Sequence, residues 1–96
     1  MNMALSNDGL EDRVEVRVLF WGRLAEIFGR ERRLSLPAEG CPLGEIRRRL
    51  AASGGEPDPE LMRADVRGSV DQVICPDSAW VRGGSEVAFL PVFSGG

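Results

Sequence analysis

The sequence predicts an α+β fold in which one main helix packs on one face of a mixed β-sheet. Two observations lead to this prediction. Apolar and polar residues alternate near the start of the chain, at 14–21, and a second β-rich apolar run lies near its end, at 86–92. Between them, at 43–53, apolar residues recur with helical spacing. A chain of 96 residues is expected to make one domain, which we place at 13–92.

The first predicted strand, 14–21, has two different faces. One face is apolar throughout and is assigned to the core: Val14, Val16, Val18 and Phe20. The other face begins polar and becomes apolar at Leu19 and Trp21, so these two side chains are candidates for a contact surface. A short helix at 23–28 and a second strand at 32–36 follow. The two strands are expected to pair as a hairpin-like unit.

The main helix is predicted at 43–53. Its apolar residues share one face, which is assigned to the core: Leu43, Ile46, Leu50 and Ala51. Its charged residues are expected to point mostly to water: Glu45, Arg47, Arg48 and Arg49. The three arginines could instead form a phosphate-binding patch, but a solvated helix face is the simpler interpretation.

The remaining elements are short. They are a loop at 56–60, a helical turn at 61–63, a strand at 66–74, a brief strand at 77–81, a turn at 82–85 and the last strand at 86–92. The first and last strands are the longest and most apolar, so we expect them side by side at the centre of the sheet. This order of elements matches a β-grasp sheet.

Composition argues against several functions. With 12 basic and 15 acidic residues, the net charge of −3 lacks the clustered basic face that binds nucleic acids or membrane surfaces. The chain has no histidine and no metal-ligand pattern, so we expect neither a metal site nor side-chain catalysis. No apolar run approaches the length of a membrane span. Residues 1–12 lack the features of a signal peptide and are expected to be a flexible lead-in to a cytoplasmic chain.

Two further features of the composition bear on chemistry. Cys41 and Cys75 have no CxxC spacing and are expected to be free thiols, with Cys75 acting as a small apolar residue. Every basic residue is an arginine. Apart from its N-terminus the chain therefore has no primary amine, so it could not accept an isopeptide bond from another copy of itself.

The sequence ends on Gly95-Gly96, after an apolar run that breaks at Pro91. Glycine lets a chain end enter a narrow site and adopt the backbone angles that the site demands. A frayed terminus is the simpler alternative. Because side-chain catalysis is not expected, the C-terminal carboxylate is the group that remains for chemistry. A separate enzyme would have to activate it with ATP as an acyl-adenylate, from which a sulfur nucleophile could displace AMP.

Three segments resemble the small subunit of molybdopterin synthase, in the MoaD-like branch of the ubiquitin-like β-grasp sulfur carriers. They are VRVLFWGRLAEIFG at 16–29, LSLPAEG at 34–40 and GGSEVAFLPVFSGG at 83–96. The resemblance covers nearly everything from Arg13 on, and is loose at 56–80. The family often has Pro-Pro-Val before the final small residues, whereas this chain has Pro91-Val92-Phe93.

The resemblance implies a role for each part of the tail. Gly96 is adenylated by a partner that resembles a ubiquitin-activating enzyme and uses ATP and Mg²⁺, and is then thiocarboxylated with sulfur from a donor protein. The tail enters the large subunit of the synthase with its last residues: Phe93, Ser94, Gly95 and Gly96. There the sulfur forms the dithiolene of molybdopterin from cyclic pyranopterin monophosphate.

The resemblance also implies where partners bind. It assigns the interface to Phe20, Trp21, Leu90 and Pro91. The chain itself is expected to hold no cofactor, and the catalytic side chains are expected on the large subunit. Three alternatives remain open: a sulfur carrier for thiamine, cysteine or tRNA thiolation, a ubiquitin-like protein modifier, and a β-grasp interaction module whose glycine tail has no role.

Overall fold

The computed structural model describes residues 13–55 and 58–92. Within them the chain forms two helices, α2 (Arg23–Phe28) and α3 (Leu43–Ala51). The strands are β1 (Arg13–Phe20), β2 (Glu31–Pro37), β3 (Cys41–Pro42), β4 (Val66–Val70), β5 (Val73–Cys75), β6 (Trp80–Val81) and β7 (Glu86–Pro91). The expected lead-in at 1–12 and the tail at 93–96 lie outside the described residues.

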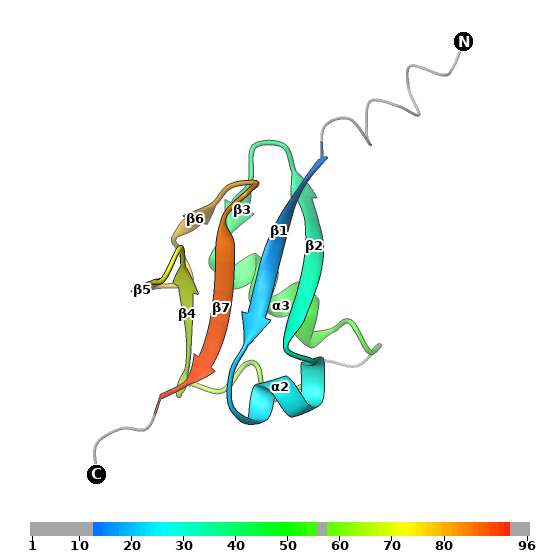
Figure 1. Ribbon diagram of the computed structural model, residues 1–96, viewed down its shortest axis with the longest axis vertical. Helices are drawn as coiled ribbons and strands as arrows, with labels where there is room; N and C mark the ends of the chain where they lie inside the picture. The colour runs from blue at the N-terminus through cyan, green and yellow to red at the C-terminus, as the bar shows by residue number, and fades with distance from the viewer. Residues whose placement is uncertain (1–12, 56–57, 93–96) are drawn as a thin grey trace.

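Five strands form one mixed sheet in the order β2-β1-β7-β4-β5 (Figure 1). β1 and β7 are parallel neighbours, with Val18 opposite Val87 and Phe20 opposite Phe89. The other pairs in this sheet, β1–β2, β4–β7 and β4–β5, are antiparallel. The prediction that the first and last long strands lie side by side in the sheet is confirmed, as is the α+β β-grasp arrangement.

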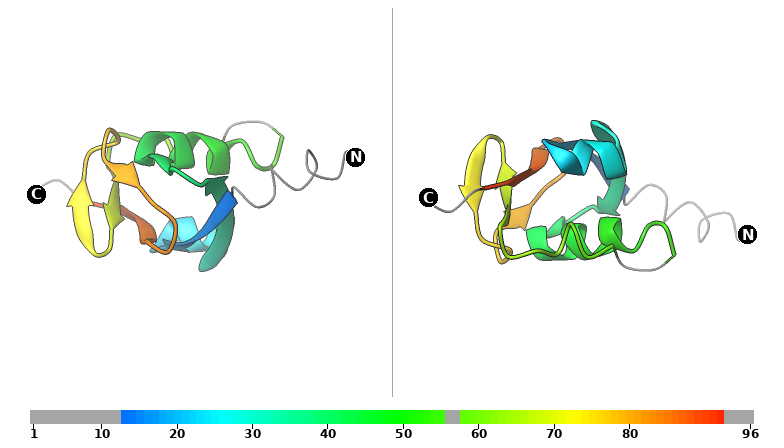
Figure 2. Two further views of the ribbon diagram at one scale, coloured as in Figure 1. Left: turned by 90° about the horizontal axis from the view of Figure 1, so that it is seen from above. Right: turned by 90° about the horizontal axis from the view of Figure 1, so that it is seen from below.

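Helix α3 covers one face of this sheet (Figure 2). The two come close at Gly68 of β4, where an added Cβ would lie 2.7 Å from Cδ2 of Leu43, so the approach depends on glycine. Helix α2 lies at the end of the sheet where β1 and β7 finish (Figure 1). The core between these elements includes the predicted inner face of β1 and its partners in β7: Val16, Val18, Phe20, Val87 and Phe89.

The prediction of a single strand at 66–74 is wrong. The chain forms the hairpin of β4 and β5 here, joined by Asp71 and Gln72. Both turn residues have positive φ, 51° and 73°, as a two-residue type I′ turn requires. The Asp71 carboxylate supports the turn by accepting the Glu86 N–H at 3.0 Å. The sequence has no glycine at this turn, and apolar residues continue on both sides of it. The sequence pattern therefore predicts one strand where the chain forms a hairpin.

The brief strand predicted at 77–81 is present as β6, but it lies outside the five-stranded sheet. It pairs instead with β3, which was not predicted, with Cys41 opposite Val81 and Pro42 opposite Trp80. The Trp80 indole N–H donates to the Glu39 carbonyl at 2.7 Å. This small sheet joins the start of α3 to the segment that precedes β7.

Arg47 is the main correction to the predicted helix, because its side chain is buried rather than solvated. The residue is only 7% exposed. Its Nη1 donates to the carbonyls of Leu61 and Val66, both at 3.0 Å, and its Nη2 donates to Asp77 at 2.9 Å. The guanidinium also lies over the Phe89 ring, 5.2 Å from its centroid. Arg47 therefore ties α3 to the segment that leads into β4.

The other two arginines of this run point elsewhere. Arg48 is exposed, as predicted. Arg49 is half-buried, and its Nη2 donates to the Ser35 carbonyl on β2 at 3.2 Å. Arg47 and Arg49 have different partners and Arg48 is exposed, so the three guanidinium groups do not form one phosphate-binding patch.

Cys41 and Cys75 are free thiols, as predicted. Burial raises the pKa of the Cys41 thiol, and the charge of Glu45 raises it further against the opposing effect of Arg49. A thiol held in its protonated form is a weak nucleophile.

Among the described residues, neither helix is long and apolar enough to cross a membrane.

Candidate functional site

The last strand leaves the sheet at Pro91, beside the end of β1. The Val92 N–H donates to the Asp65 carbonyl at 2.7 Å, which holds the chain up to this point. Pro91 packs against Gly22, where an added Cβ would lie 3.0 Å from the Pro91 Cγ. Gly22 also has a φ of 60°, a conformation that favours glycine. The predicted tail residues follow directly and lie outside the described residues: Phe93, Ser94, Gly95 and Gly96.

The sheet face opposite α3, which we call the open face, carries apolar side chains next to this exit. Residues paired across strands point to the same side of a sheet. The register therefore sets one row across four strands: Leu19, Ala88, Ser69 and Ile74. Trp21 and Leu90 lie one step nearer the exit, on the same face. We call the following residues the apolar patch: Leu19, Trp21, Ile74, Ala88 and Leu90.

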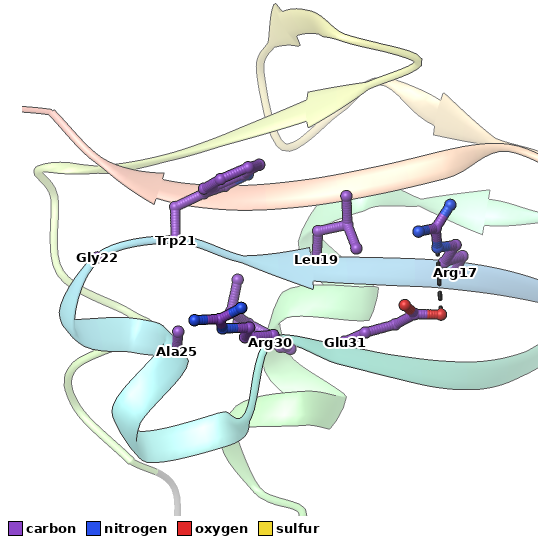
Figure 3. A pocket seen from close by; sticks show the side chains of 8 residues that line it. Arg17, Leu19, Trp21, Gly22, Ala25, Arg30 and Glu31 are labelled. Carbon is purple, nitrogen blue, oxygen red and sulfur yellow. Dashed lines mark ion pairs between the residues drawn. The ribbon is translucent and has the colours of Figure 1, made fainter.

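Trp21 is the most prominent residue of the apolar patch. It is 56% exposed, and its backbone N–H is fixed by the Phe89 carbonyl at 3.1 Å. Figure 3 shows the indole lying over β7, with the Leu19 side chain on the same side of β1. Leu90 is half-buried. The residues that the sequence singled out as a contact surface, Leu19, Trp21 and Leu90, thus share one face.

Phe20 is the only one of the four predicted interface residues that is buried. It is 2% exposed and stacks on Phe28 and Phe89, with ring centroids 5.1 and 6.1 Å away. Assigning Phe20 to the partner interface is therefore wrong, since its side chain belongs to the core. Consecutive residues of a strand point to opposite faces, so an aromatic pair here can present only one ring to a partner.

Ile74 is the member of the apolar patch that the sequence did not indicate. It is 56% exposed on edge strand β5, in register with Ser69 of β4. A single strand at 66–74 gives no reason to place Ile74 in the same row of the sheet as Ala88. The positive-φ turn at Asp71 and Gln72 folds it back onto the open face, and no glycine in the sequence signals that turn.

Farther from the exit, the open face becomes charged. Arg17 lies between two carboxylates, with Nε 3.1 Å from Glu31 and Nη1 3.4 Å from Glu86. Arg33 and Glu15 lie 3.7 Å apart on the same face. Exposed pairs of this kind add little to stability. Their opposite charges do, however, leave this part of the face with little net field.

A groove of about 570 Å³ lies beside the apolar patch, near the junction of α2 and β2 (Figure 3). Part of its lining is apolar, from Leu19, Trp21 and Ala25. The charged part of its lining consists of Arg17, Arg30 and Glu31. Gly22, which contacts Pro91, also lines the groove, so the groove adjoins the exit of the tail.

The segment before β4 holds the exit from the other side. The Asp65 carboxylate is 3.1 Å from Arg63 and 3.8 Å from Arg23, and Arg23 also donates to Glu60 at 2.8 Å. The hydrogen bond from Arg63 holds the pKa of Asp65 below its ordinary value, and the charge of Arg23 acts in the same direction. Asp65 therefore stays ionised at neutral pH, and its ion pairs link the exit segment to α2.

The described residues contain no group of three or more histidine, cysteine, aspartate or glutamate side chains placed to hold a metal ion. What the arrangement offers a partner is an apolar patch with the end of the chain emerging beside it. A surface of this kind can bind another protein next to the point where β7 ends.

The family model of the ThiS family matches residues 18–96. The chain belongs to the ThiS family. The matched range starts in β1, includes the apolar patch and the exit, and extends to Gly96. Membership gives this ThiS-family chain a ubiquitin-like sulfur-carrier fold. None of the curated proteins matches it.

Solved structures share the fold of this ThiS-family chain. SAMP1 from Haloferax volcanii is 20% identical, with a TM-score of 0.67, over 85% of this chain and 99% of its own. A protein from Pyrococcus furiosus, provisionally described as subunit 1 of a molybdopterin converting factor, is also 20% identical with a TM-score of 0.67, over 83% and 99%. The HVO 2177 protein of Haloferax volcanii is 17% identical, with a TM-score of 0.70, over 88% and 89%.

Proposed function

We propose that this chain is the sulfur-carrying small subunit of a molybdopterin synthase and acts in the cytoplasm. The observation that supports this most directly is the exit of β7 beside the apolar patch, which lets one partner hold the domain while it receives the tail. Membership of the ThiS family supports the sulfur-carrier chemistry. The Pyrococcus furiosus neighbour and the segments that resemble the MoaD-like branch favour the molybdopterin pathway.

The proposed chemistry occurs at the carboxylate of Gly96. A partner resembling a ubiquitin-activating enzyme binds ATP and Mg²⁺, and the carboxylate attacks the α-phosphate and releases pyrophosphate. Hydrosulfide supplied by a donor protein then attacks the acyl carbon, and the bond between that carbon and the AMP phosphate oxygen breaks, so AMP leaves and a thiocarboxylate remains. Presenting sulfur on a docked carrier fixes its position next to the substrate. In the large subunit the thiocarboxylate supplies sulfur for the dithiolene, starting from cyclic pyranopterin monophosphate.

The length of the tail suits this role. Four residues beyond Val92 reach roughly 13 Å at full extension. Ordering them in a partner costs about 1–2 kcal/mol per residue, which burial of the apolar patch must offset. The side chain of Phe93 is the largest of the tail and adds apolar area close to the reactive end.

Intact mass spectrometry tests this proposal. The purified chain is incubated with ATP, a sulfide source and extract of the native host, beside a variant that lacks Gly96. A mass gain equal to exchanging one oxygen for sulfur, seen only when Gly96 is present, is the expected result. No change, in an extract that activates a known carrier, would contradict the proposal and favour an interaction module. If the product then sulfurates a substrate other than the pyranopterin, the chain serves another pathway.

A ubiquitin-like modifier is the second candidate, because one neighbour is described as small archaeal modifier protein 1 of Haloferax volcanii. Activation of Gly96 would begin in the same way, but an amine of another protein would then take the acyl group. The same experiment separates the two functions, since a modifier produces a ladder of heavier conjugates. Because the chain has no lysine, copies could be joined to one another only through the N-terminal amine, so no branched polymer could form.

Replacing Leu90 with glutamate is expected to weaken binding to the large subunit while leaving the domain folded. Leu90 is half-buried on the open face, where it pairs with Arg67 of β4, so the new carboxylate can face that guanidinium. The charge would nevertheless have to be desolvated when a partner covers the apolar patch. Calorimetric titration measures the affinity and circular dichroism the fold. Loss of the folded state would mean that Leu90 acts as a core residue.

A further inference from the structure

The groove beside the apolar patch contains a positive charge that the fold leaves free. The Arg30 side chain is exposed, and no described residue forms an ion pair or a hydrogen bond with its guanidinium. Its backbone is fixed, because its carbonyl accepts the Phe20 N–H at 3.0 Å. In Figure 3 the guanidinium lies beside Ala25, apart from the Arg17–Glu31 pair.

The neighbouring arginines are engaged, which distinguishes Arg30 from them. Arg17 contacts Glu31 and Glu86, and Arg32 donates to the Phe28 carbonyl at 2.7 Å and to Ser53 at 3.1 Å. Among the residues that line the groove, Glu31 is paired with Arg17, so the charge without an opposite partner is the positive charge of Arg30. Its apolar lining lies directly beside that charge, from Leu19, Trp21 and Ala25.

A partner protein fits this groove better than the chain's own tail or a second copy of the chain. Fixing four tail residues in it would cost more than one buried side chain and one exposed ion pair return, so the chain's own tail is a poor occupant. In a symmetric contact in which the two grooves meet, the two Arg30 guanidinium groups would repel each other. A different protein can place a carboxylate opposite Arg30 without this repulsion between like charges.

We propose that this groove recognises a carboxylate that stands beside an apolar side chain on a partner protein. The apolar side chain packs on Trp21, Leu19 and Ala25, while the carboxylate pairs with Arg30. The site adjoins the exit of the tail through Gly22, so binding there orients the partner toward the chain end. Arg30 thereby selects among partners that could all bury the apolar patch, since a partner with a basic residue at this place is repelled.

Small peptides test this without any sulfur chemistry, so the result is independent of the proposed function. The full chain, labelled with ¹⁵N, is titrated with N-acetyl-Leu-Glu-amide, its glutamine analogue and its lysine analogue. We expect shifts of the Trp21 indole and of the Gly22, Ala25 and Glu31 amides, with the glutamate peptide binding about threefold tighter than the glutamine peptide. Equal affinity for the three peptides, or shifts centred elsewhere, overturns the proposal.

Two charge-reversed variants complete the test. R30E should prefer the lysine peptide, whereas R82E, which changes an exposed arginine before the start of β7, should retain the preference for glutamate. Retention of that preference by R30E contradicts the assignment. Shifts of the groove signals on dilution without peptide identify a second copy as the occupant and overturn the partner proposal. If the peptides bind only after residues 93–96 have been removed, the chain's own tail is the occupant of the groove, and the partner proposal is overturned.

Discussion

Replacing Trp21 with alanine is expected to reduce affinity for the proposed partner, the large subunit of a molybdopterin synthase, by about 30-fold. Tryptophans at the centre of an interface typically contribute about 2 kcal/mol or more when truncated. Trp21 is 56% exposed in the isolated domain, lies next to the exit of β7 and shares the open face with Leu19 and Leu90. Calorimetric titration of the two purified proteins measures the change.

The domain itself should be little affected by this substitution. Because more than half of the Trp21 surface is exposed, its removal should lower the free energy of unfolding by only about 1 kcal/mol. Trp80, which is 49% exposed on β6, provides a matched control. Trp80→Ala should leave docking unchanged, although it removes the hydrogen bond to Glu39. Equal affinities for the wild type and Trp21→Ala would show that the apolar patch is not the docking surface.

Replacing Arg47 with alanine is expected to lower the free energy of unfolding by about 3 kcal/mol. The substitution leaves the carbonyls of Leu61 and Val66 buried without their donor and removes the cation from the Phe89 ring. Because the Asp77 side chain is 52% exposed, its loss of a partner contributes less than the two carbonyls. For a domain of this size the melting temperature should fall by more than about 10 °C.

The adjacent residue of the same helix provides the control for this prediction. Arg48 is exposed, so Arg48→Ala should change the free energy of unfolding by about 0.5 kcal/mol at most. Arg47→Lys should give an intermediate loss, since one ammonium group cannot serve the three acceptors that the planar guanidinium reaches. Urea unfolding of the three variants measures these differences. Equal stability of Arg47→Ala and Arg48→Ala would contradict the buried role.

The elements predicted most accurately are those whose sequence pattern and packing agree. Strict alternation through Val14, Val16 and Val18 marks β1, and helical spacing of Leu43, Ile46 and Leu50 marks α3. Both sets are buried or half-buried on the expected faces. The adjacency of β1 and β7 followed from their length and apolar character, because the most apolar strands of a sheet are shielded by neighbours on both sides.

The features that the sequence did not predict are those set by tertiary contacts. Arg47 has the same local setting as Arg48, and only the carbonyls that it meets across the fold explain its burial. Asp71 and Gln72 adopt positive φ although neither is a glycine. The hydrogen bond from the Glu86 N–H to the Asp71 carboxylate supports this turn. Because the turn was not predicted, the sequence also did not indicate that Ile74 belongs to the apolar patch.

The resemblance to a family located the candidate site more accurately than it identified each residue there. It indicated the two aromatic residues at the end of β1, but the side-chain alternation of a strand buries Phe20 and exposes Trp21. The groove beside Trp21 could not be inferred from sequence. It depends on where α2 and the start of β2 place Ala25 and Arg30 relative to β1.

The position of β7 has a consequence for biosynthesis on the ribosome. This strand is the last in sequence but the middle one in the sheet, and its contacts with β1 join residues as distant as Val18 and Val87. A nascent chain cannot complete the sheet until β7 has emerged, because β7 joins β1 and β2 to β4 and β5. Any chain that displays the assembled open face has therefore been translated at least through Pro91. A partner that recognises that face therefore rejects chains that terminate before β7 is complete.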